Sequence, residues 1–332
     1  MRSACRANIQ RLETALGSVL QGVHFFDWAE DVTARILRGG GAIQVPIELS
    51  PGLLEYCRVR RLSFVPNLPE RARLEIGSKE FELQVSVKYA DNWPWARFFA
   101  FHELAHTVLF DARTWPPTGR VPLRPGDPDL EWCCSYLAKA FLMPSNLVSE
   151  ELKSSSLPHL PSFEAGEFFR TARHFIVPWH LLFERLVEAL GRWDVWAMYW
   201  KYEPEPERND RRSTKGSWRL TWQTHPRLVP DDLFIVTSRS TPEGPGKRPK
   251  ARGRFAAFLD HVVNLPTGEQ IRVEESDLVH GNLKEFLLSH NPDAPHWAIP
   301  IGSAPSFEAI SSLSVPSVLI IASLSRQMEM AS

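Results

Sequence analysis

Hydrophobic residues recur every three or four positions over the first part of the chain. They are Leu12, Leu16, Val19, Leu20, Phe26, Trp28, Val32 and Ile36. This spacing is typical of one face of a helix, and Gly22 interrupts it. We therefore expect one or two amphipathic helices within residues 1–40.

Residues 41–88 show a different pattern, in which apolar and polar positions alternate. The alternation is clearest in residues 81–87, and shorter β-rich runs occupy residues 61–65 and 73–76. Alternate side chains of a strand point to opposite faces, so these runs predict a small sheet with one exposed face.

Two helical segments follow, separated by a loop. Residues 95–110 are apolar at helical spacing, whereas residues 111–127 contain the prolines and glycines of an irregular connection. The second helix is expected to begin with Asp127 as its N-cap and Pro128 at its first position. Pro144 is expected to end it.

In the last part of the chain the sequence pattern changes from one typical of helices to one typical of strands. Residues 163–190 contain two helical patterns separated at residues 176–178. The strands expected after residue 192 are residues 195–202, 218–222, 233–237 and 315–322. The tryptophans at 193, 196 and 200 also fit a helix, but Tyr199 and Tyr202 favour a strand.

Composition and charge narrow the class of protein. The chain has 332 residues, 43% of them hydrophobic, and a formal net charge of −1. Such a balance excludes a protein that coats nucleic acid or a membrane surface through bulk charge. No apolar run has the roughly 20 residues that a membrane span needs, and the N-terminus has no signal-peptide pattern. We expect a cytoplasmic protein with no membrane partner.

Cysteine usage agrees with a reducing compartment. The four cysteines, Cys5, Cys57, Cys133 and Cys134, show no CxxC or CxxH spacing. The last two are adjacent, which suits neither a metal clip nor an ordinary structural disulfide. Reduced thiols are therefore expected.

The residues that carry chemistry lie in the first of the two central helices. His102 and His106 are four positions apart in an HExxH motif, so both imidazoles lie on one face and can bind one metal ion. Glu103 lies on the adjoining face, where a carboxylate can take a proton from water as a general base. The alternative is an exposed polar stripe on an amphipathic helix.

A catalytic zinc ion needs a third protein ligand and an open position, and Glu131 in the first turn of the next helix is the candidate. Glu131 lies on the same side of that helix as Cys134, Ser135 and Ala138. An unpaired carboxylate facing a core is costly, whereas a metal ligand is not. The alternative is an acidic residue that only offsets the helix dipole. We expect zinc, with manganese as the other candidate ion.

These segments resemble a known family. Residues 95–109, WARFFAFHELAHTVL, resemble the signature helix of the ImmA/IrrE family of metallopeptidases. Residues 131–144, EWCCSYLAKAFLMP, are similar to its second motif, in which a glutamate ligand precedes Ala-Asn, Phe-Ala and Leu-Met-Pro. Here Cys134 and Ser135 stand in place of Ala-Asn, and Leu137 replaces Phe. The resemblance covers about residues 40–190 and extends to a helix-turn-helix-like segment around residues 171–186.

The resemblance implies an α+β protein with a zincin (gluzincin-like) metallopeptidase core, a small antiparallel sheet and a helix-turn-helix-like segment. Together with the texture change, it divides the chain into N-terminal helices (1–40), the peptidase core (41–160), the helix-turn-helix-like segment (161–192) and a β-rich regulatory or interaction domain (193–332). The implied substrate is a helix-turn-helix repressor of the XRE type, cleaved to derepress stress-response or mobile-element genes.

Other functions stay open on the sequence. One is a metal-containing sensor, or a protein- or DNA-binding regulator, without peptidase activity; another is an unspecialised zinc hydrolase. Intact Glu103 favours the enzyme, because a structural site needs ligands but no base. The basic run at residues 247–254 could contact nucleic acid, although a solvated loop is the favoured interpretation. Candidates for stabilising the oxyanion are Tyr89, Tyr136, His159, His174 and His180.

Overall fold

The computed structural model describes a defined set of residues. They are residues 13–20, 22–42, 44–77, 80–110, 126–153, 164–189, 195–204, 216–223, 251, 253–266, 269–273, 296–300 and 316–323. Cys5, His159, the strand expected at 233–237 and most of the basic run at 247–254 lie outside them.

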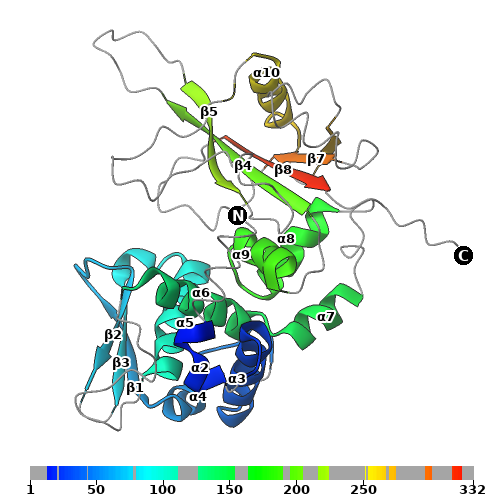
Figure 1. Ribbon diagram of the computed structural model, residues 1–332. Coiled ribbons are helices and arrows are strands. Elements are labelled where there is room, and N and C mark those ends of the chain that lie inside the picture. The colour runs from blue at the N-terminus through cyan, green and yellow to red at the C-terminus, as the bar shows by residue number, and fades with distance from the viewer. Residues whose placement is uncertain are drawn as a thin grey trace, which may run out of the picture. The chain divides into compact units, whose positions relative to one another are not determined.

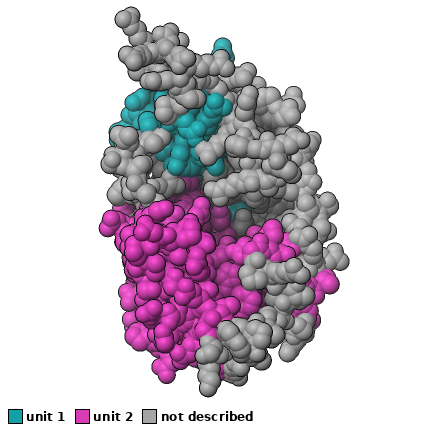
Figure 2. All heavy atoms as spheres, turned by 90° about the vertical axis from the view of Figure 1, so that its left-hand side faces the viewer, with its two compact units in different colours: residues 1–2, 156–168, 186–332 teal, residues 3–155, 169–185 magenta. Residues whose placement is uncertain are grey.

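The chain divides into two units, which Figure 2 shows in different colours. Unit 2 contains residues 3–155 and 169–185, and unit 1 contains residues 1–2, 156–168 and 186–332. Unit 2 is therefore discontinuous in sequence. It holds the predicted metal ligands and the predicted base, and each unit has its own sheet (Figure 1).

The sheet of unit 2 has three strands. They are β1 (Val59–Val65), β2 (Ala72–Ile76) and β3 (Phe81–Ser86), in the order β1-β3-β2. The three strands confirm the alternating pattern, and the buried side chains of β3 are Phe81, Leu83 and Val85. The expectation of a wholly antiparallel sheet is wrong. β2 pairs with β3 antiparallel, but β1 pairs with β3 parallel, because β2 connects them and lies at the opposite edge.

Two helices of unit 2, α3 (Phe25–Gly39) and α5 (Trp93–Leu109), pack against α6 (Pro128–Leu142), as Figure 1 shows. Others are α2 (Gly17–Leu20), α4 (Pro51–Tyr56), η1 (Val87–Tyr89), α7 (Ser145–Lys153) and α9 (Trp179–Glu184). The two central helices expected from the sequence are confirmed. Phe101 of α5 and Phe141 of α6 are fully buried, and their ring centroids lie 5.9 Å apart. Burial of each side chain contributes about 1.5–3 kcal/mol to the free energy of unfolding.

A buried arginine connects α5 to two distant parts of unit 2. Arg97 is 2% exposed, and its guanidinium donates to the backbone carbonyls of Ile47, Phe175 and Ile176. Burial lowers the pKa of Arg97 to about 10, which leaves it charged at neutral pH. These hydrogen bonds satisfy carbonyl groups that no helix or strand pairs, and they fix the orientation of the helix that carries the HExxH motif.

The described part of the segment 161–192, residues 164–189, contains short helices. α8 (Ala165–His174) and α9 are separated at residues 175–178, which confirms the two helical patterns, and η3 (Arg185–Ala189) follows. Ile176 adopts a positive φ of 50° in the connection. Residues 169–185 belong to unit 2, so the boundary between the units falls within this segment.

Unit 1 is built on a five-stranded antiparallel sheet. Its strands are β4 (Val195–Pro204), β5 (Gly216–Gln223), β6 (Ile271–Arg272), β7 (His296–Pro300) and β8 (Ser317–Ser323), in the order β5-β4-β8-β7-β6. The strands expected at 195–202, 218–222 and 315–322 are confirmed. One helix, α10 (Gly253–Val262), was not expected; its Phe255 and Leu259 pack with Trp200 in the core of the unit.

The described helices include none that is both long and apolar enough to cross a membrane.

Candidate metal centre

Helix α5 presents two of the predicted ligands on one face. His102 and His106 are one turn apart, and their ring centroids lie 5.2 Å from each other. His106 is buried, and the side chain of His102 is only 15% exposed. Both imidazoles therefore reach the same small region beside the helix.

Helix α6 brings the third predicted ligand to that region. The carboxylate of Asp127 caps α6 by accepting a backbone hydrogen bond of 2.9 Å, which confirms the predicted N-cap. Glu131 consequently lies in the first turn. Its Oε2 is 3.0 Å from His102 Nε2 and 3.8 Å from His106 Nε2, and its Oε1 accepts from the Gly126 backbone N–H at 3.2 Å.

The donor atoms of His102, His106 and Glu131 fit a divalent metal ion. All three lie within 4.8 Å of one another. Zinc binds nitrogen and carboxylate oxygen at about 2.0–2.2 Å, so ligand atoms around a tetrahedral ion lie about 3.3–3.6 Å apart. The separations of 3.0 and 3.8 Å bracket this range. Two imidazoles and one carboxylate are also the donor set of an open catalytic zinc site.

Local electrostatics put the ligands in the forms that bind cations. Burial lowers the pKa of His106 to about 4, and the charge of His102 acts in the same direction. A hydrogen bond from His102 holds the pKa of Glu131 below its ordinary value, although partial burial opposes this. At neutral pH, His106 is thus a neutral imidazole and Glu131 a carboxylate, and each has a lone pair available for a metal.

The second nitrogen of each imidazole also has a partner. Ser135 Oγ lies 3.2 Å from His102 Nδ1, and Cys134 Sγ lies 3.3 Å from His106 Nδ1. Both partners are on α6, within four residues of Glu131. The sequence pattern places Cys134 and Ser135 on the same side of the helix as Glu131 but assigns neither of them a role.

Glu103 lies between the ligand cluster and the small sheet. It follows His102 on α5, is partly buried, and accepts a backbone hydrogen bond from Leu74 of the edge strand β2. Burial raises the pKa of Glu103 to about 7, and the negative charge of Glu131 adds to this effect, whereas His102 opposes it. A carboxyl group with a pKa near neutrality can both accept and return a proton.

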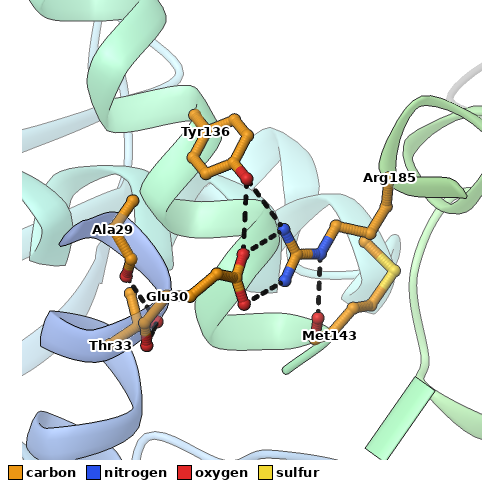
Figure 3. A network of polar contacts seen from close by, with 6 residues as sticks. All are labelled: Ala29, Glu30, Thr33, Tyr136, Met143 and Arg185. Atoms are coloured by element: carbon orange, nitrogen blue, oxygen red, sulfur yellow. Dashed lines mark hydrogen bonds and ion pairs between the residues drawn. The ribbon is translucent and has the colours of Figure 1, made fainter. Parts of the chain in front are cut away.

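The other titratable candidates from the sequence have partners of their own. Tyr136 Oη bonds Arg185 and Glu30, as Figure 3 shows, and the ring of Tyr89 packs on Phe99. His174 lies 3.9 Å from Glu151, and the ring of His180 lies 5.0 Å from that of Trp95. The oxyanion-stabilising group therefore stays unassigned among these residues.

Comparisons with known proteins assign no family. No family model matches the chain, and no curated protein matches it. Among solved structures, it is similar to one described as a Mycobacterium tuberculosis transcriptional regulator, with a TM-score of 0.42 and 12% identity. That match covers 95% of this chain and 81% of the other. The functional inference therefore rests on the residues of the site.

Proposed function

We propose that this protein is an intracellular zinc-dependent endopeptidase with a zincin-like core. His102, His106 and Glu131 hold the metal, and Glu103 is the general base. The observation that carries the proposal is the convergence of these three donor atoms from α5 and α6 within 4.8 Å of one another, with Glu103 adjacent to the first ligand.

The metal ion and Glu103 have different roles, which follow from the chemistry of each. When bound, a zinc ion supplies Lewis acidity toward a peptide carbonyl and lowers the pKa of water. The carboxylate of Glu103 accepts a proton from the attacking water and returns it to the leaving amine. Its hydrogen bond from Leu74 holds it in place on the side of strand β2. A dication held by the neighbouring ligands would lower the pKa of Glu103 and favour its proton-accepting form.

We propose a protein substrate, an XRE-type repressor whose cleavage derepresses stress-response or mobile-element genes. This part of the proposal is supported by the resemblance of residues 95–109 and 131–144 to the ImmA/IrrE motifs. The cytoplasmic location expected from the sequence belongs with it, because such a repressor acts inside the cell.

The test separates metal binding from chemistry through Glu103→Gln. This variant keeps the size of the side chain but cannot accept the proton, so cleavage should slow by about 10²- to 10⁴-fold while the zinc content stays unchanged. XRE-type repressors from the source genome are incubated with zinc-loaded wild type and with the variant, and products are followed by mass spectrometry. Glu55→Gln, a change at an exposed glutamate whose charge is not among those that shift the pKa of Glu103, is the matched control and should cut at the wild-type rate.

Three outcomes decide between the functions. Cleavage by Glu103→Gln within tenfold of wild type would assign the base elsewhere. If wild type and variant both bind zinc and a repressor but neither cuts it, the protein is a binding or sensing regulator. Cutting by wild type alone supports the peptidase.

A further inference from the structure

The two metal-facing histidines are supported by consecutive residues of one helix. Ser135 Oγ is 3.2 Å from His102 Nδ1, and Cys134 Sγ is 3.3 Å from His106 Nδ1. Glu131, Cys134 and Ser135 are three and four positions apart, which places them on one face of α6. This one face of α6 thus provides the candidate ligand Glu131 and a hydrogen-bond partner for each of the two histidine ligands.

The contacts determine which ring nitrogen is free to bind a metal. A neutral imidazole carries one proton, and the nitrogen without it is the one that can act as a ligand. Without a metal, Nε2–H of His102 donates to Glu131 Oε2. When Nδ1–H donates to the serine oxygen or the cysteine sulfur instead, Nε2 keeps its lone pair for a metal. In both His102 and His106, Nε2 is the atom that faces Glu131 Oε2.

We propose that Cys134 and Ser135 are positioning residues that hold His102 and His106 with Nε2 toward the metal. The inference rests on the metal site of the proposed function. It assigns a use to the two positions at which this chain departs from the family motif. The hydrogen bonds fix both the tautomer and the ring orientation, and outer partners of this kind strengthen metal binding.

The two supports are chemically unequal. A serine hydroxyl is a good hydrogen-bond acceptor, whereas a cysteine sulfur is a weak one. Cys134 is also fully buried, so its thiol meets His106 without competition from water, while Ser135 is partly exposed. The sulfur therefore contributes through shape and exclusion of water as well as through the hydrogen bond.

The proposal is tested by the zinc affinity of the full chain. Competition with a chromophoric chelator measures this affinity and does not depend on peptidase activity. Ser135→Ala and Cys134→Ala should each bind zinc about 10- to 100-fold more weakly than wild type. Cys134→Ser restores a partner at Nδ1 and should recover affinity to within a few-fold. The thermal stability of each metal-free variant is recorded alongside, so that a loss of folding is not mistaken for a loss of ligand support.

Cys133→Ala is the matched control. Cys133 is as buried as Cys134, but it lies about 100° around the helix from it. Its removal makes a similar cavity and should leave zinc affinity at the wild-type value. Equal losses in Cys133→Ala and Cys134→Ala, or wild-type affinity in Ser135→Ala, would overturn the positioning role. If His102→Ala, His106→Ala retains wild-type affinity, the metal site of the proposed function itself is wrong.

Discussion

Arg185 and Glu30 form a two-point ion pair in unit 2, with Nη1–Oε1 and Nη2–Oε2 distances of 2.6 and 2.8 Å (Figure 3). The Arg185 side chain is fully buried, and its remaining bonds go to Tyr136 Oη at 3.3 Å and the Met143 carbonyl at 3.0 Å. Tyr136 lies on α6, and Met143 is the C-cap of the same helix. The ion pair therefore anchors the helix that carries Glu131 to α3.

Removal of Glu30 should destabilise unit 2. In Glu30→Ala the buried guanidinium of Arg185 loses its counter-charge, and the free energy of unfolding should fall by about 3 kcal/mol. Urea denaturation measures this. Asp31→Ala is the control, because its pair with Arg35 is exposed and contributes little. Equal midpoints for the two variants would show that the buried pair contributes no more than the surface one.

Loss of the histidine ligands should remove the metal. The double variant His102→Ala, His106→Ala takes away two of three donors and should contain less than a tenth of the wild-type zinc, measured by mass spectrometry after dialysis. His174→Ala, at a half-exposed histidine beside Glu151, should keep its zinc. Undiminished zinc in the double variant would place the ion elsewhere.

A shortened chain should retain the site. Residues 1–189 include all of unit 2 with Arg185, so we expect this fragment to fold and to bind zinc like the full protein. Circular dichroism and metal titration measure the two properties. A fragment ending at residue 155 lacks residues 169–185, which bond Arg97 and Glu30, and should be unstable. Equal stability of both fragments would contradict this account.

Two buried thiols should resist modification. Burial raises the pKa of Cys57 and of Cys133 to about 12, so at pH 8 about one molecule in ten thousand carries either thiolate. In a Cys5→Ser background, a disulfide reagent should label neither until urea unfolds the protein. Rapid labelling of the folded protein at either position would contradict the burial.

The raised pKa values of Cys57 and Cys133 also determine how the free energy of unfolding should depend on pH. Between the unfolded value of 9.0 and the folded value of about 12, the folded state binds more protons than the unfolded one. The free energy of unfolding should therefore fall as pH rises through this window. Cys57→Ala should weaken that fall relative to wild type, as measured by urea denaturation at pH 8 and pH 10.

The central helices and the candidate site were predictable because their signals are local. The HExxH spacing places two side chains one turn apart, and Asp127 with Pro128 marks the start of the next helix. The sequence pattern does not predict α10, although Phe255, Phe258 and Leu259 have helical spacing, because the basic run at residues 247–254 favours a loop and overlaps the start of the helix.

Other features have no local signature. Alternation along β1 is the same whether its partner runs parallel or antiparallel, so the pattern does not reveal that β3 lies between β1 and β2. Glu30 and Arg185 are ordinary charged residues in helical segments, and nothing in either neighbourhood identifies a partner 155 positions away. The partners of the imidazole Nδ1 atoms likewise depend on how α5 and α6 pack.

The sequence separation of Glu30 and Arg185 also determines how long after Glu30 the ribosome adds Arg185. A ribosome that adds about 5–20 residues per second needs about 8–30 s to make the 155 residues between them. Once α6 ends at Leu142, about 43 more residues, or about 2–9 s of synthesis, separate it from the arginine that joins it to α3. Unit 2 cannot complete its core until the intervening residues of unit 1 have also been made. The nascent chain therefore exposes the apolar faces of α3 and α6 for seconds before unit 2 can close around them.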